Sequence, residues 1–515
     1  MKHRSTGNAA RVIADGLSAL LCLFMLCVVP LLFRDAFFDI NRVKVSAVIA
    51  VVPLVTILWS AAVLLGAHRK EKVKAGAAAS ACMALFAASA ILACAVNGFE
   101  PSMLTGDKGR YCGLYFTLSC AAGFFVISSG RFSCRRLVPL IVLCSSICSL
   151  LGVLNVMGVD PLGFYTHIKK GQEQVFLSTI GHFDFFGTFL IMVFGLSGGC
   201  FVFAKRPCDG VLAAAASFVL CLGMSASRTD SAFAGMHLVC ISLIAVSGGA
   251  CCRISRALFL WAGAFLSLPA VYTLLPLSPY HPQVSGLPLM MYENGYALAA
   301  GAVLIIAAAV FAVLQHKGIK APGRRPLMLS VLVVVLCAVL LTLTLMVYFS
   351  VFEKEKDLGG LTSVLRFNDK WGSLRGFAYI RSLRAFDDYT LIEKLFGRGM
   401  ETTLSTLTPY FDNEAMLSTG VFNDPHCQLL QFLLTCGVFG AMAFAAFYLA
   451  IVVTVAAQMR DDPVLCGIFA SMIGYAVILA INVTQPILIS TYFSLSALAI
   501  SRIRTIREEG EACES

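Results

Sequence analysis

Residues 326–350 read PLMLSVLVVVLCAVLLTLTLMVYFS, an apolar run without Asp, Glu, Lys or Arg. About 20 such residues cross the hydrocarbon core of a bilayer when they form an α-helix. Comparable runs recur along the whole chain. In total, 58% of the residues are hydrophobic and 13% are charged, against roughly 25% charged residues in an ordinary soluble domain. Because so few polar residues cannot cover the surface, most of the exterior must face lipid.

We therefore predict an all-α fold, a polytopic transmembrane helical bundle of about 12–14 spans. The candidate spans on either side of the quoted run and including it are 13–33, 45–67, 75–97, 111–130, 137–158, 185–204, 210–226, 230–250, 257–277, 295–315, 326–350, 428–457, 465–482 and 486–502.

The positive charges are unevenly shared between alternate loops. If the N-terminus lies inside, the inner loops and termini hold 22 Lys and Arg, whereas the short outer loops hold eight. Short loops rich in Lys and Arg stay in the cytoplasm, so we expect both termini there and residues 351–426 outside. Anionic membrane lipids then account for the formal charge of +10. We expect no nucleic-acid partner, because no basic stripe is interleaved with aromatic residues.

A long polar loop follows the quoted run and divides the chain. The four expected regions are N-terminal transmembrane helices at 1–158, central transmembrane helices at 159–350, a large extracytoplasmic loop at 351–426, and C-terminal helices with a cytoplasmic tail at 427–515. Apolar residues recur at helical spacing across 375–396, and Gly397 ends the pattern. This pattern predicts an amphipathic helix along the outer membrane face.

His426 lies where the long loop meets the next apolar span, in the run Asp424-Pro425-His426-Cys427-Gln428. An imidazole titrates near neutral pH and can take a proton from a hydroxyl nucleophile. Two interpretations stay open: a general base at the mouth of a membrane cavity, or a histidine at a helix start that water satisfies. Asp424 could orient the ring or cap the local turn.

Three arginines fall on the same expected outer side. Arg375 and Arg381 lie on the predicted loop helix, and Arg228 lies between two spans. A guanidinium holds phosphate oxygens by two parallel hydrogen bonds, so these residues are candidates for clamping a pyrophosphate. The alternative is headgroup binding for the two loop arginines, and an ion pair with Asp230 that fixes the turn for Arg228.

His182 and Asp184 precede a span that contains Gly187 and Thr188. Small residues at these places permit close packing or close approach of the backbone. Capping and packing are one interpretation of this segment, and binding of a ligand is the other.

Several classes of chemistry lack their sequence signals. The chain has no Walker A loop, no GxGxxG after a strand, no HExxH and no pair of CxxC motifs. We therefore expect no metal and no cofactor. The spans hold almost no Asp, Glu, Lys or Arg, which argues against an ion-coupled transporter.

Four motifs, in order, resemble those of the O-antigen ligase and O-antigen polymerase superfamily of membrane glycosyltransferases. They are Ser178-Thr179-Ile180-Gly181-His182-Phe183-Asp184-Phe185-Phe186-Gly187, Ser227-Arg228, Gly372–Phe377 with Leu395–Gly399, and His426-Cys427 followed by Gly437 and Gly440. The resemblance covers about residues 160–450. Cys427 replaces the family's usual polar residue, and His182 and Asp184 stand where asparagine is frequent.

The resemblance implies a donor glycan on undecaprenyl pyrophosphate at the outer face of a bacterial cytoplasmic membrane. It implies transfer to a sugar hydroxyl of an acceptor glycan or glycolipid, in contact with membrane lipids and without metal or nucleotide sugar. By motif, His426 would be the base that acts on the acceptor, and Arg228 and Arg375 would bind the pyrophosphate. We therefore predict His426 and Arg375 as catalytic residues, and Arg228, Arg381 and His182 as pyrophosphate-binding residues.

Three classes of function stay open at this point. Within the superfamily, a ligase moves the glycan to a different anchor and a polymerase extends the same glycan. A flippase for lipid-linked oligosaccharides, or another polytopic transporter, is the alternative from a different class. A structural or sensing membrane protein is the third.

Overall fold

The computed structural model of the chain describes residues 2–66, 76–284, 286–411, 424–482 and 485–514. The structure is 78% helical. In the described residues the strands are limited to one short antiparallel pair, β1 (Phe176–Leu177) with β2 (Gly181–His182), in which Phe176 pairs with His182. The predicted all-α class is confirmed.

Within the described residues, twelve helices are long and apolar enough to cross a membrane, and α6 and α10 are shorter apolar helices. Each predicted span coincides with one of them. These helices are α1 (Lys2–Leu23), which continues through a π-helical turn (Phe24–Val28) and α2 (Val29–Leu31), α3 (Ile40–Gly66), α4 (Ala77–Val96), α6 (Leu114–Ser129), α7 (Cys134–Val156), α8 (Phe183–Val202), α9 (Pro207–Ser227), α10 (Asp230–Val246), α11 (Cys251–Tyr272), α13 (Tyr296–His316), α14 (Arg324–Val351), α20 (Gln428–Gln458), α21 (Pro463–Ile481) and α22 (Pro486–Glu514).

Short helices connect these spans. They are α5 (Pro101–Thr105), α12 (Gly286–Glu293), α15 (Thr362–Leu365), α16 (Trp371–Asp387), α17 (Leu391–Phe396), α18 (Thr403–Leu407), and the 3₁₀ turns Phe164–His167, Glu173–Val175, Leu275–Leu277, Gly359–Leu361 and Thr408–Tyr410.

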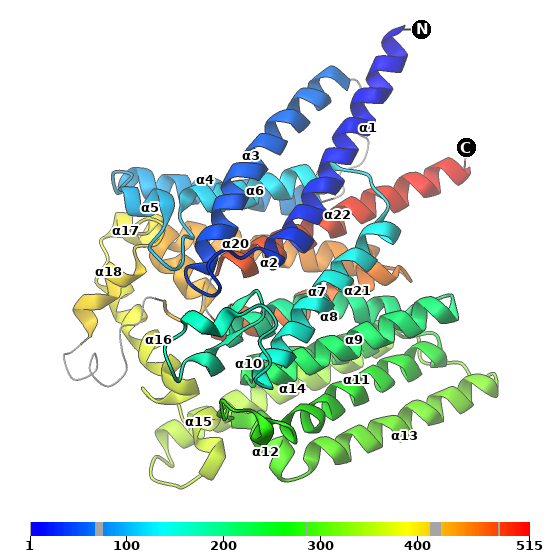
Figure 1. Cartoon of the computed structure of the whole chain (residues 1–515), viewed down its shortest axis with the longest axis vertical. Helices are drawn as coiled ribbons and strands as arrows, with labels where there is room; N and C mark the ends of the chain where they lie inside the picture. The colour runs from blue at the N-terminus through cyan, green and yellow to red at the C-terminus, as the bar shows by residue number, and fades with distance from the viewer. Residues whose placement is uncertain (1, 67–75, 285, 412–423, 483–484, 515) are drawn as a thin grey trace.

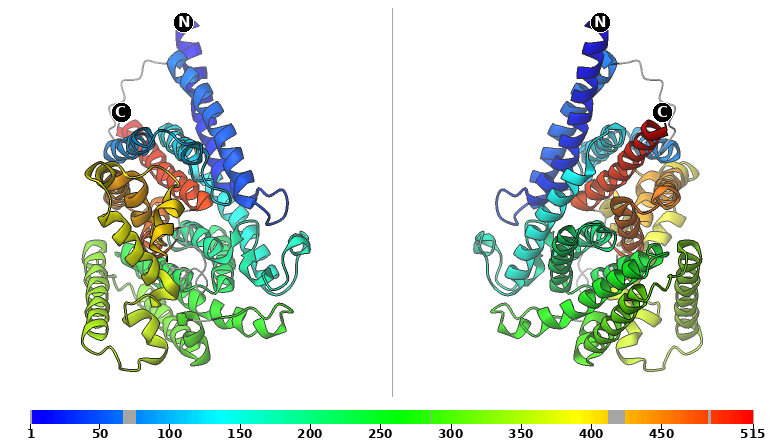
Figure 2. Two further views of the ribbon diagram at one scale, coloured as in Figure 1. Left: turned by 90° about the vertical axis from the view of Figure 1, so that its left-hand side faces the viewer. Right: turned by 90° about the vertical axis from the view of Figure 1, so that its right-hand side faces the viewer.

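Three helices form the centre of the bundle. The apolar windows of α8, α21 and α22 are 83%, 72% and 94% buried, whereas that of α14 is 0% buried. Small residues let α8 and α21 approach closely. A Cβ added to Gly195 would lie 2.4 Å from Ser471 Oγ, and one added to Gly199 would lie 2.5 Å from Gly467 Cα. Helix α14 stands at the edge of the bundle, where its apolar surface suits contact with lipid (Figure 2).

The two ends of the chain and the long loop lie on opposite sides of the bundle. Figure 1 shows α15 to α18 on the left with α5, whereas the marked N- and C-termini lie on the right. Helix α14 ends at Val351 and α20 begins at Gln428, so the long loop connects two spans. A multi-pass membrane protein with its long loop on one side follows from this arrangement.

The prediction of a single helix across 375–396 was wrong, because the chain breaks after Asp387 and starts again at Leu391. Thr390 and Glu393 form a capping box there: Glu393 Oε2 accepts the Thr390 N–H at 2.8 Å, and Thr390 Oγ1 accepts the Glu393 N–H at 3.3 Å. Such a box satisfies the open donors of a new helix start, so it overrides the apolar periodicity that suggested continuity.

Candidate active site

The turn Asp424–Cys427 closes the long loop just before α20. Asp424 Oδ1 accepts the backbone N–H of His426 at 2.6 Å, so Asp424 caps the turn, one of the two roles left open. His426 has a φ of +54°, a conformation that side-chain-bearing residues rarely adopt. The Tyr379 hydroxyl donates to the His426 carbonyl at 3.2 Å. The backbone therefore holds His426 in one fixed, strained geometry.

Asp424 also makes a buried ion pair with Arg110, from the loop between α5 and α6. The Arg110 side chain is 5% exposed and that of Asp424 is 1% exposed. Glu401 lies buried beside them with a φ of +57°. Burial raises the pKa of Glu401 to about 7, and the nearby Arg110 guanidinium opposes that rise. Arg110, Asp424 and Glu401 thus form a buried charged cluster next to the turn that contains His426.

Arg375 lies on α16, close to the same turn. Its Nε donates to the Ile481 carbonyl at the end of α21, and its Nη1 donates to the Gly372 carbonyl, both at 2.6 Å. Positive φ angles at Gly372 and Leu374 bend the chain just before it. In the part of the chain that the structure describes, Nη2 of Arg375 has no acceptor, so it can still bind an anion.

The electrostatic surroundings of His426 favour its neutral form. Burial lowers the pKa of the imidazole from its ordinary value of 6.5, and the Arg375 and Arg110 guanidinium groups act in the same direction. Asp424 and Asp184 oppose this shift. A neutral imidazole at physiological pH can accept a proton, which is the requirement for a general base.

Arg228 lies at the end of α9 with a φ of +60° and is 9% exposed. Its guanidinium stands 5.5 Å from the centre of the Phe183 ring. It donates to the backbone carbonyls of Ala226, Gln283 and Gln174. The pair with Asp230 is not formed among the described residues, since Asp230 accepts the Leu287 N–H at 2.8 Å. Arg228 thus fastens three backbone segments together, and five N–H donors leave it capacity for a ligand.

His182 caps the start of α8. Its Nδ1 accepts the Asp184 N–H at 3.3 Å, and its ring stacks on Phe183 at 4.3 Å between centres. Burial lowers the pKa of His182, Asp184 opposes the shift, and Arg228 adds to it. The capping interpretation therefore matches the geometry. Asp184 acts electrostatically on both His182 and His426, so it links the α8 start to the His426 turn.

Arg381 is occupied by a partner on its own segment. Its Nη1 donates to Asp369 Oδ1 at 2.7 Å, and its guanidinium lies 3.9 Å from the centre of the Phe377 ring. No interaction within the described ranges joins Arg381 to His426. The structure therefore brings His426, Arg375 and, through Asp184, the His182 end of α8 together, whereas Arg381 is held by Asp369.

Three residues of this site were not predicted from the sequence. Arg110 counted only as one of the basic residues of the short outer loops, and its partner Asp424 lies 314 residues away. Glu401 and Tyr379 carry no motif of their own. The one available signal was that Arg110 is a charged residue in a short outer loop, on the side of the membrane with few Lys and Arg. That signal does not indicate which residue Arg110 pairs with.

The glycines of the last two motifs form one packed unit. Gly437 interrupts α20 with φ 66° and ψ −171°, which opens the carbonyls of the preceding turn. The Leu434 carbonyl accepts the Arg398 N–H at 3.1 Å, and the Thr435 carbonyl accepts the Gly399 N–H at 2.9 Å. Irregular backbone at membrane depth is tolerated when protein satisfies its polar groups. The loop is thereby fastened to the helix that follows His426.

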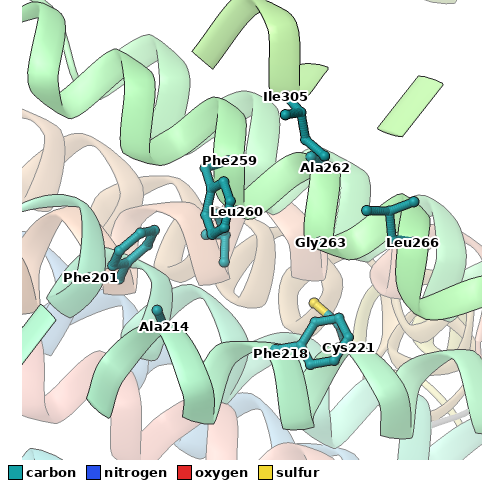
Figure 3. Close-up of a pocket in the computed structure, with 10 residues that line it drawn as sticks. All are labelled: Phe201, Ala214, Phe218, Cys221, Phe259, Leu260, Ala262, Gly263, Leu266 and Ile305. Atoms are coloured by element: carbon teal, nitrogen blue, oxygen red, sulfur yellow. The ribbon is translucent and has the colours of Figure 1, made fainter. Parts of the chain in front are cut away.

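An apolar cavity lies away from this polar site. Its volume is about 200 Å³, and it opens between α9 and α11 (Figure 3). Its walls are Phe201, Ala214, Phe218, Cys221, Phe259, Leu260, Ala262, Gly263, Leu266 and Ile305. Such a lining offers no group for acid–base chemistry. No group of three or more His, Cys, Asp or Glu side chains in the described residues is arranged to hold a metal ion.

Residues 289–445 match the protein-family model described as O-antigen ligase. This match supports the resemblance of the chain to the O-antigen ligase superfamily. No curated protein matches the chain. The O-antigen ligase match, with the helical bundle, supports a multi-pass membrane enzyme that transfers glycosyl groups as a ligase or polymerase.

The matched O-antigen ligase segment holds only part of the site. It contains Arg375, Arg381 and His426, together with Gly399 and Gly437. His182 and Arg228 lie before it in the chain. The side chains around the His426 turn thus come from inside and outside the family segment.

Proposed function

We propose that the chain transfers or polymerises a glycan from an undecaprenyl-pyrophosphate donor onto an acceptor sugar hydroxyl. The reaction takes place at the outer face of a bacterial cytoplasmic membrane and needs no metal. One observation carries the proposal: in the O-antigen ligase segment, a histidine with a lowered pKa lies near an arginine that keeps an open donor. Both termini are then cytoplasmic, in keeping with their place opposite the long loop (Figure 1).

In this mechanism the neutral imidazole of His426 takes the proton of the acceptor hydroxyl while that oxygen attacks the anomeric carbon of the donor. The new glycosidic bond forms as the bond from that carbon to the pyrophosphate oxygen breaks. The lipid pyrophosphate leaves with the bonding electron pair. Arg375 stabilises the negative charge that develops on the leaving oxygen.

The remaining basic residues take supporting roles in the proposal. Arg228 and His182 lie around Phe183 and would contact the outer phosphate oxygens. Arg381 would have to exchange Asp369 for a phosphate, because that carboxylate already pairs with it. We therefore expect Arg381 to contribute less than Arg375. Both arginines match the bidentate geometry of phosphate.

Reconstitution with defined substrates tests the proposal. Purified protein in lipid vesicles receives an undecaprenyl-pyrophosphate glycan and candidate acceptors in the presence of EDTA, and glycosylated product is measured. We expect product with the wild type and with His316→Ala, an exposed histidine of α13, but not with His426→Ala. A requirement for a divalent metal would refute the metal-free mechanism.

Bacterial cells in which His426→Ala or Arg375→Ala replaces the wild-type protein separate the transferase from a flippase. If His426→Ala blocks transfer, the lipid-linked glycan accumulates at the outer leaflet, where an added glycosidase cleaves it. If the chain were a flippase, the intermediate would stay at the inner leaflet and resist the glycosidase.

A further inference from the structure

A buried ion pair connects the N-terminal half of the chain to the His426 turn. Arg110 Nη2 donates to Asp424 Oδ2, across 314 residues of sequence. Both side chains are almost fully buried, at 5% and 1% exposed. Taking two charges out of water is costly, and removal of either partner leaves the other charge uncompensated. Such a pair fixes the relative position of the two segments that carry it.

The two oxygens of the Asp424 carboxylate face different partners. Oδ2 binds the Arg110 guanidinium, and Oδ1 accepts the His426 N–H at 2.6 Å. The orientation of the carboxylate therefore decides the backbone conformation of His426, whose φ of +54° is unfavourable without such a cap. This one carboxylate therefore joins the Arg110 guanidinium to the backbone of His426.

The loop that presents Arg110 is itself tightly built. Gly106 has a φ of +85°, and a Cβ added there would lie 2.6 Å from the Tyr111 carbonyl carbon. Asn41 donates to the Gly109 carbonyl at 2.7 Å, and the Tyr111 hydroxyl donates to Asp39 at 2.8 Å. Contacts from the start of α3 and from the segment before it thus hold the Arg110 loop in place.

We infer that Arg110 is a positioning residue for His426, which it holds through Asp424, and that the N-terminal helices complete the transferase site. The inference rests on the proposed role of His426 as the base. Arg110 lies outside the O-antigen ligase segment at residues 289–445. That segment alone therefore lacks one of the residues that hold His426 in position.

The charges around His426 make the inference testable by titration. These charges are Asp424 in the turn itself, Arg110 from the loop before α6, Arg375 with Tyr379 from α16, and Asp184 from α8. Glu401, whose pKa burial raises to about 7, lies beside Arg110 and Asp424. Loss of Arg110 leaves Asp424 uncompensated beside the imidazole, which favours its protonated form. Loss of the Asp424 charge removes the negative charge next to the imidazole while Arg110 stays, which favours the neutral form of His426.

The experiment compares Arg110→Gln, Asp424→Asn and the double variant Arg110→Gln/Asp424→Asn in the full-length protein. Arg384→Gln, which removes an exposed charge from α16, is the control. Diethyl pyrocarbonate acylates neutral imidazole, so the pH dependence of labelling at residue 426, followed by mass spectrometry, reports its titration without reference to activity. Transfer rates against pH are measured in parallel, and thermal unfolding confirms that each variant folds.

We expect the labelling midpoint to rise in Arg110→Gln and to fall in Asp424→Asn, by at least about half a pH unit each. The double variant removes both charges of the pair, so its labelling midpoint returns toward the wild-type midpoint. Its transfer rate stays below the wild-type rate because the amide that Asp424→Asn introduces caps the turn less firmly. Arg384→Gln matches the wild type in both measurements. The acid limb of the transfer rate moves with the labelling midpoint.

Unchanged midpoints in both folded single variants, or shifts in the same direction, would overturn the inference. Full transfer activity in the double variant would overturn it as well. The labelling result stands even if the wild type transfers no glycan. In that case the proposed function fails, whereas the coupling of Arg110 to His426 is judged on the midpoints alone.

Discussion

Substitution of Gly437 by alanine tests why the family glycines are spaced as they are. Gly437 has φ 66° and ψ −171°, a region that only glycine occupies readily. An added Cβ would lie 2.4 Å from the carbonyl carbon and oxygen of Leu395. Both atoms belong to the backbone, so neither can move aside as a flexible side chain would.

The expected loss of stability has three sources. The disfavoured backbone conformation costs about 1–3 kcal/mol, and forcing a methyl group into a packed site costs about 1–3 kcal/mol. If α20 straightens to relieve the overlap, the hydrogen bonds from Arg398 and Gly399 to the Leu434 and Thr435 carbonyls are lost. Each of those contributes roughly 0.5–1.5 kcal/mol. Since strain and straightening are alternatives, we expect a net loss of about 2–5 kcal/mol.

The assay is the thermal unfolding midpoint of the purified protein in detergent, with Gly263→Ala as the matched control. Gly263 lies in α11, and a Cβ there would meet only Phe218 Cδ2 at 3.6 Å, an ordinary contact. We expect the midpoint to fall by about 5 °C or more in Gly437→Ala and to stay within about 2 °C of the wild type in Gly263→Ala. Equal midpoints for the two variants would refute the packed-glycine explanation.

Three further outcomes follow from named contacts. Arg375→Lys cannot keep the hydrogen bonds to Ile481 and Gly372 and still reach a phosphate, so we expect a transfer rate about 10- to 100-fold lower, whereas Arg384→Lys should match the wild type in initial rates. Glu401 has a folded pKa of about 7 against an ordinary 4.5. Its cost to stability is therefore absent below pH 4.5, grows as the pH rises toward 7, and reaches about 3 kcal/mol above that. Glu401→Gln should accordingly raise the unfolding midpoint at pH 8 and not at pH 5, and an equal effect at both pH values would be inconsistent with this. Lys44→Met removes the three hydrogen bonds that the buried amine donates to the carbonyls of Val29, Pro30 and Leu32 at 2.7–2.9 Å. We expect this change to lower the free energy of unfolding by about 3 kcal/mol. An equal free energy of unfolding for Lys108→Met, which replaces an exposed lysine, would contradict this role of Lys44.

The transmembrane part of the fold was predictable because every helix that crosses a lipid bilayer must be a long apolar segment. A span needs about 20 apolar residues, and runs such as 326–350 show this directly in the sequence. The break between α16 and α17 was not predicted. There a local capping box of Thr390 and Glu393 competes with apolar periodicity, and periodicity alone does not show which of the two is stronger.

The site was predictable only in part, for a physical reason. His426 and Arg375 stood out because each carries an ionisable group in a polar loop between spans. The ion pair of Arg110 with Asp424 could not be foreseen, since a single contact across 314 residues leaves no periodic pattern. Nor could the sequence show that Arg381 is already paired with Asp369. Such pairings depend on how the helices pack.

The pH dependence of glycan transfer, measured for the wild type and for His426→Gln, tests the role of His426 most directly. Because the pKa of His426 lies below its ordinary 6.5, the wild-type rate should rise with pH along a limb centred below that value and then level off. His426→Gln should lower the rate by about 10²- to 10⁴-fold and remove the limb. A His426→Gln rate close to the wild-type rate, or the same limb in both proteins, would contradict the assignment of His426 as the base.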